Sequence, residues 1–78
     1  MREYNYYKSL NLPSVLINAI KEYLKGYNEY KVNKNYHHFD LDIEDLQSAI
    51  NICEFNSREI SSEMANFLRE DLEVLYRD

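Results

Sequence analysis

The densest group of ionisable side chains is an acidic run at the middle of the chain, Asp40-Leu41-Asp42-Ile43-Glu44-Asp45. Alternating carboxylates of this kind open the calcium-binding loop of an EF-hand, which also needs a glycine at its sixth position and a bidentate glutamate at its twelfth. Counting from Asp40, these two positions hold Asp45 and Asn51. The carboxylates are explained instead as capping and dipole-complementing groups at the start of a helix. We predict no metal site here.

The other candidates for metal-ligand or nucleophile chemistry are His37, His38 and Cys53. Neighbouring side chains diverge on a helix and on a strand, so the two histidines cannot easily hold one ion together. Cys53 follows Ile50 on an apolar stripe and precedes Glu54, whereas a reactive thiolate needs an accessible, electropositive environment. The sequence therefore predicts no catalytic residue, no metal ligand and no cofactor, and we expect a protein that is not an enzyme.

Apolar residues at three- and four-residue spacing predict helices at about 13–27, 42–54 and 56–77. Pro13 suits the first turn of the first helix, and Gly26 is expected to end it. Asp42 is the expected cap of the second helix. The fold expected is all-α, mainly helical: one small three-helix domain over residues 1–78.

The third helix has the strongest start signal. Asn56 with Glu59 three residues later matches a reciprocal capping arrangement, and Phe55 with Ile60 matches a hydrophobic staple. The segment before the second helix has no helical stripe, and a short β-hairpin or an irregular connector around residues 30–39 are both open alternatives.

Composition excludes several classes of protein. The chain has 78 residues with one Gly, one Pro and one Cys, which is too little glycine for a phosphate-binding loop and too little cysteine for a disulfide framework. No run approaches the ~18 consecutive apolar residues of a membrane span. We expect a cytoplasmic protein without a membrane partner. The bias toward Asn, Lys, Tyr and Ile suits an AT-rich genome, and so a bacterial or phage origin.

The net charge of −5 conceals two unlike halves. Residues 1–36 hold six basic and three acidic side chains, a net +3, while residues 37–78 hold three basic and eleven acidic ones, a net −8. Seven of the eight tyrosines lie in the basic half. A core of this size cannot enclose all of them, so we expect several to be exposed, as tyrosines at protein interfaces are.

These features favour a non-enzymatic, acidic protein–protein interaction protein that occupies a basic groove of a partner protein, as an inhibitor or antagonist. In size and charge it is similar to toxin-immunity proteins and to inhibitors from phages or mobile elements. The expected partner-binding residues are five acids and two tyrosines: Glu59, Glu63, Glu70, Asp71, Glu73, Tyr30 and Tyr36.

Two alternatives remain. The segment with Cys53–Asn56 as its turn has the order of a helix-turn-helix, which suggests a small DNA-binding regulator. The acids of the third helix disfavour a nucleic-acid partner, because affinity for DNA rests largely on Lys and Arg. The second alternative is a self-associating accessory domain, in which the +3 half of one copy meets the −8 half of another in a homo-oligomer.

Overall fold

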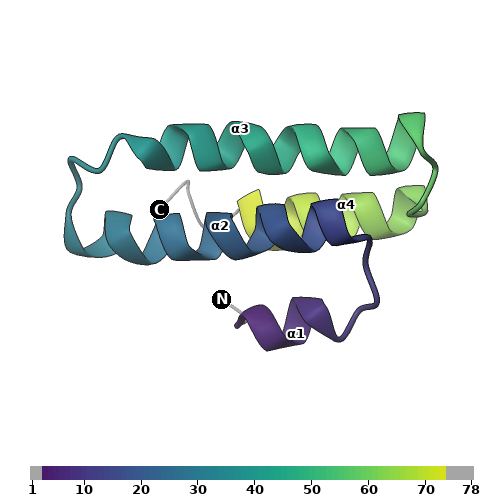
Figure 1. Ribbon diagram of the computed structural model, residues 1–78, viewed down its shortest axis with the longest axis horizontal. Helices are drawn as coiled ribbons and strands as arrows, with labels where there is room; N and C mark the ends of the chain where they lie inside the picture. The colour runs from purple at the N-terminus through teal and green to yellow at the C-terminus, as the bar shows by residue number, and fades with distance from the viewer. Residues whose placement is uncertain (1–2, 74–78) are drawn as a thin grey trace.

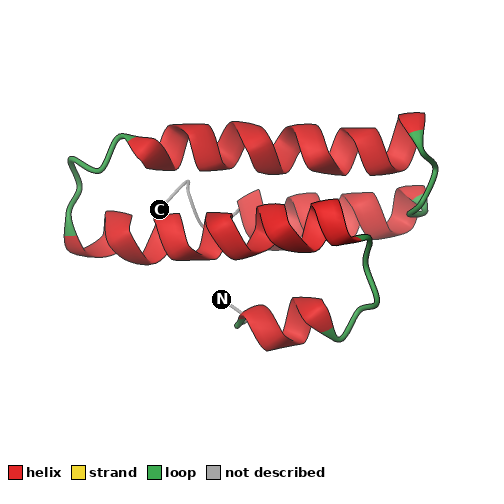
Figure 2. Ribbon diagram, viewed as in Figure 1, coloured by secondary structure: helices red, strands yellow, loops and turns green. Residues whose placement is uncertain are grey.

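The computed structural model describes residues 3–73, which form helices joined by short loops and contain no strand (Figure 2). In chain order the elements are α1 (Tyr4–Lys8), α2 (Ser14–Val32), α3 (His38–Asn51), a π-helical turn η1 (Ile52–Asn56) and α4 (Ser62–Glu73). The expected all-α class is confirmed. No hairpin forms at residues 30–39, because α2 continues to Val32 and only residues 33–37 connect it to α3.

Helices α2 and α3 run antiparallel as a long pair, α4 lies behind them, and α1 lies beside α2 (Figure 1). All four helices and η1 contribute side chains to one core. The fully or nearly fully buried apolar residues are Tyr7, Leu16, Ile20, Tyr23, Leu24, Phe39, Ile43, Leu46, Ala49, Ile50, Cys53, Ala65, Leu68 and Leu72.

Gly26 does not end α2 as the sequence suggested. It is buried inside the helix and has no positive φ. A methyl group at this position would overlap the Asp42 carboxylate and would lie 3.2 Å from a ring carbon of Phe39. Glycine therefore serves a close approach of α3 to α2, and the helix continues past it because the following tyrosines pack on the core.

Helix α3 begins at His38, four residues before the expected start. The reason is Phe39, which is buried among the rings of Tyr23, Tyr27 and Tyr30 at centroid distances of 5.3, 6.0 and 5.2 Å. Packing of this aromatic cluster draws the residues before Asp42 into the helix. The prediction that Asp42 caps this helix was therefore wrong, since His37 holds the cap position.

Helix α4 begins at Ser62 rather than at Asn56. Its cap is Ser61, whose Oγ accepts a hydrogen bond from the Met64 backbone N–H at 3.1 Å, as an N-cap residue does. Asn56 instead ends η1, and Phe55 is 64% exposed, so the expected capping box and staple are both wrong.

Arg58 is what separates η1 from α4, because its φ of 53° turns the chain in the left-handed region. The predicted end of the third helix at residue 77, with Leu75 and Tyr76 on its stripe, lies outside the described residues.

The tyrosines are core residues more than surface residues. Of the seven in the described part of the chain, two are buried and five are partly buried against the core: Tyr7 and Tyr23, and then Tyr4, Tyr6, Tyr27, Tyr30 and Tyr36. Three of them lie in α1, which the sequence did not predict and which packs against α2. The expectation that several are exposed was wrong for these seven, since each packs on the core, although only two are completely buried.

Two tyrosine hydroxyls join α4 to the rest of the fold. Tyr7 of α1 donates to Oδ2 of Asp71 at 2.5 Å, and Tyr23 of α2 donates to the backbone carbonyl of Leu72 at 2.6 Å. The Tyr23 bond is buried and joins residues 49 positions apart in the chain.

Candidate functional site

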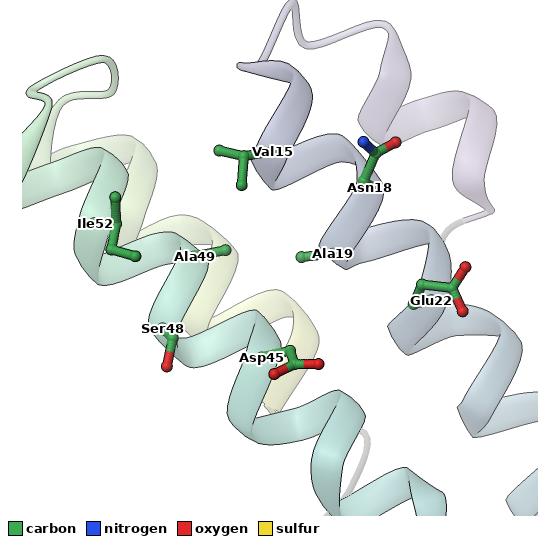
Figure 3. Close-up of a pocket in the computed structure, with 8 residues that line it drawn as sticks. All are labelled: Val15, Asn18, Ala19, Glu22, Asp45, Ser48, Ala49 and Ile52. Carbon is green, nitrogen blue, oxygen red and sulfur yellow. The ribbon is translucent and has the colours of Figure 1, made fainter.

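A surface groove of about 300 Å³ lies between α2 and α3 (Figure 3). Four residues of α2 and four from α3 and the start of η1 line it: Val15, Asn18, Ala19, Glu22, Asp45, Ser48, Ala49 and Ile52. Ala19 and Ala49 point toward each other across its middle (Figure 3). Their small side chains leave the space that larger apolar residues would fill.

The two ends of the groove differ in chemistry (Figure 3). Val15 and Ile52 lie on opposite walls at one end, and they are 51% and 46% exposed. Glu22 and Asp45 line the other end. Because α2 and α3 are antiparallel, the apolar and acidic pairs lie about two helical turns apart along the groove.

A third carboxylate, Asp42, lies one turn before Asp45 on α3. Burial raises the pKa of Asp42 above its ordinary value of 3.8, and the charges of Glu22 and Asp45 raise it further, while His38 and Lys25 oppose them. Acids of α2 and α3 therefore repel one another at this end of the groove. A cationic group placed there would relieve that repulsion.

Replacing Asp42 with asparagine tests this repulsion through pH. A carboxyl whose pKa is raised on folding contributes no penalty below its unfolded pKa, and its penalty grows as the pH rises through its folded pKa. Asp42→Asn should therefore raise the urea midpoint at about pH 7, and the difference from the wild type should vanish toward about pH 3.

Glu44→Gln is the matched control, because it removes one exposed charge from the same helix. It should give no comparable gain at neutral pH. A lower urea midpoint for Asp42→Asn at neutral pH would show that Lys25 and His38 outweigh burial and the two acids.

The acids expected from the sequence to bind a partner lie on α4 and the loop before it. Glu59, Glu63 and Glu70 are exposed, and Glu59 accepts a hydrogen bond from Ser57 Oγ at 3.1 Å. Asp71 is half-buried and accepts the hydroxyl of Tyr7, so it also has a structural role. Glu73 is the last residue of α4, and its side chain lies outside the described part.

The two expected tyrosines lie at the turn between α2 and α3. Tyr30 is stacked on Phe39 at 27° between the ring planes, and the Lys34 ammonium lies 4.7 Å from its ring centroid. Tyr36 lies 5.9 Å from the His38 ring. In Figure 1 this turn is at one end of a molecule 36 Å long, whereas the loop with Glu59 is at the other end. The fold therefore does not bring these tyrosines together with Glu59.

None of the seven residues named from the sequence as partner-binding lies on α3. This helix carries four acids and no Lys or Arg. Asp40, Glu44 and Asp45 are exposed, and none of the three has an ion-pair partner within residues 3–73. The run was visible in the sequence, but capping and dipole effects explained it without any partner.

The cysteine and the proposed DNA-binding segment have structural explanations. Cys53 is fully buried, and burial, followed by the charge of Glu59, raises the pKa of its thiol. Ten residues, 52–61, separate α3 from α4, whereas a helix-turn-helix joins its helices by three or four. The arrangement thus differs from that motif.

Within residues 3–73 there is no group of three or more His, Cys, Asp or Glu side chains placed to hold a metal ion. No helix in this range combines the length and the apolar character needed to cross a bilayer. The chain matches no protein-family model, and no curated protein or solved structure is similar enough to count as a match.

Proposed function

We propose that this protein is a non-enzymatic protein-binding domain that binds a basic surface of a partner protein through α3 and the groove beside it. Where that basic surface is the partner's own binding groove, occupation of it would inhibit the partner. The observation that carries the proposal is the set of exposed α3 carboxylates, Asp40, Glu44 and Asp45, which no cation in the described chain neutralises.

Two kinds of physical argument support this. Unpaired carboxylates of one sign create a potential that attracts basic partners and speeds association. Apolar side chains beside them supply the desolvated contact that charge alone does not give. Val15 and Ile52 are such side chains, since each is about half exposed at the groove.

The test uses the immobilised protein in a lysate of its source cells, with two variants that each remove three exposed charges. One variant is Asp40→Asn/Glu44→Gln/Asp45→Asn, and the other is Glu59→Gln/Glu63→Gln/Glu70→Gln. Exposed ion pairs contribute about 0.2–1 kcal/mol each, so losing three should weaken binding about tenfold. We expect the α3 variant to lose the bound protein and the second variant to retain it.

The same capture at roughly 0.05 and 0.5 M NaCl checks the electrostatic part, because salt screens exposed charges. A protein that both variants and both salt concentrations retain equally would contradict the proposal. Loss from the second variant alone would transfer the site to the acids around α4, including Glu59, Glu63 and Glu70.

The two alternative functions give different results. A DNA-binding regulator would retard mixed duplex DNA at low salt. However, Arg69, the one basic side chain of α4, is already bound to Glu54 and Asn51. Self-association would appear as a sedimentation coefficient that falls as salt is added.

A further inference from the structure

We infer that the groove between α2 and α3 docks one helix of the partner, an amphipathic helix with apolar side chains on one face and Lys or Arg beside them. The inference rests on the proposed function and specifies the partner's chemistry. Two properties of the groove carry it: its shape, and the order of apolar and acidic side chains along it.

The first property is shape. The groove runs from Val15 to Glu22 along α2, which at 1.5 Å per residue is about 10 Å, or two turns of helix. An inserted helix presents its anchors at positions i, i+3 or i+4, and i+7, which span the same length. Between Ala19 and Ala49 both walls end in a methyl group, and the central apolar anchor of the partner helix is placed there.

The second property is the order of the chemistry along the groove. An apolar anchor of the partner would contact Val15 and Ile52, and a cation about two turns away would lie at the end of the groove that Glu22 and Asp45 line. That cation would also offset the repulsion that Asp42 experiences from both of these carboxylates. An acidic helix would add to the repulsion, and nucleic acid would bring phosphates to the same carboxylates.

A second copy of this chain is a poorer occupant. Outside the groove, the large apolar residues exposed within residues 3–73 are Val32, Leu41 and Phe55, which belong to three different elements, so another copy offers no continuous apolar stripe along one helix. The cations nearest the α2–α3 turn, Lys31 and Lys34, lie over the rings of Tyr27 and Tyr30. They are not arranged beside a free apolar stripe.

The probe for the test is a synthetic Leu/Lys peptide of about 15 residues, long enough to be helical when bound, with Leu on one face and Lys on the other. A peptide of the same composition, scrambled so that Leu and Lys no longer segregate, is the first control. Both are titrated into the full-length, isotope-labelled protein, and amide chemical shifts are followed. We expect the amphipathic peptide to bind at least about tenfold more tightly and to shift the amides of Val15, Ala19, Ala49 and Ile52.

Two variants test the two ends of the groove against matched controls. Ile52→Gln is compared with Leu41→Gln, since Ile52 and Leu41 are exposed to similar extents, 46% and 53%, and Leu41 lies outside the groove. Glu22→Gln/Asp45→Asn is compared with Glu29→Gln/Glu63→Gln, which removes the same charge from two exposed acids outside the groove and outside the α3 carboxylates. Each groove variant should weaken the amphipathic peptide about fivefold or more, and each control less than about twofold. Circular dichroism and thermal melting verify that all four variants fold.

The outcomes separate this inference from the proposed function. Equal binding of the amphipathic and scrambled peptides, or equal effects of the groove variants and their controls, would overturn the groove assignment and leave a purely electrostatic acidic surface. Absence of binding by either peptide at low salt would overturn both. Both the groove inference and the proposed function would be supported if the amide shifts are confined to the groove and only the groove variants bind the amphipathic peptide more weakly.

Discussion

Replacing Tyr7 with alanine is expected to lower the free energy of unfolding by about 3–5 kcal/mol, the usual result of removing a large buried aromatic side chain. Tyr7 is 0% exposed, packs at right angles to the Tyr6 ring and bonds to Asp71 of α4. Small domains have about 0.05–0.15 kcal/mol of stability per residue, or about 4–12 kcal/mol for this length. The variant should therefore lose a large share of the stability of the domain.

The measurement is urea unfolding followed by circular dichroism, together with a fall in melting temperature of about 12 °C or more. Tyr7→Phe separates packing from the hydroxyl group, because it keeps the ring and removes the hydroxyl that donates to Asp71. That variant should lose about 1–2 kcal/mol. Tyr4→Ala is the matched control, since Tyr4 lies on the same short helix and is only partly buried. An equal loss from Tyr4→Ala and Tyr7→Ala would show that Tyr7 does not anchor α1.

Replacing Arg69 with methionine is expected to remove about 2–3 kcal/mol, because it leaves a nearly buried carboxylate without its cation. Arg69 donates to Glu54 Oε1 at 2.6 Å, to Asn51 Oδ1 at 2.7 Å and to Asn66 Oδ1 at 3.2 Å. The side chain of Glu54 is only 7% exposed. Most of the lost free energy of unfolding therefore comes from the unpaired Glu54 charge. The rest comes from losing the hydrogen bonds that join α4 to α3 and η1.

A double-mutant cycle with Glu54→Gln measures this effect directly. The double variant Glu54→Gln/Arg69→Met should be more stable than Arg69→Met alone, with a coupling energy of about 1–3 kcal/mol. Arg69→Lys should keep part of the stability, since lysine retains the charge but cannot donate in the forked geometry of arginine. Additive losses from the two single variants would contradict the assignment.

The contact between Arg69 and Glu54 explains why the surface charge of α4 differs from the charge inferred from its sequence. Counting charges along the chain treats Arg69 as one of the few cations facing several acids. In the fold it is already occupied by a carboxylate from η1, 15 residues earlier. The exposed surface of α4 is consequently more negative than the count of charged residues along the helix suggests. Binding of DNA through α4 is therefore less favourable.

The sequence by itself determined the all-α class, because the three- and four-residue spacing of apolar side chains is a local property of each helix. The shift in charge along the chain was also readable there. Helix boundaries followed sequence signals only where no distant contact competed with them. At Gly26 and Phe39 the outcome depended on which residues of another element came close.

Tertiary structure alone decided where most tyrosines lie and where the candidate site is. Tyr7 is buried because a five-residue helix with no strong local signal packs on α2 and reaches α4. The groove exists because two alanines, 30 residues apart, meet across antiparallel helices, with an apolar pair at one end and an acidic pair at the other. Pairings of this kind depend on the packing of the whole chain, so no spacing within either helix could have indicated them.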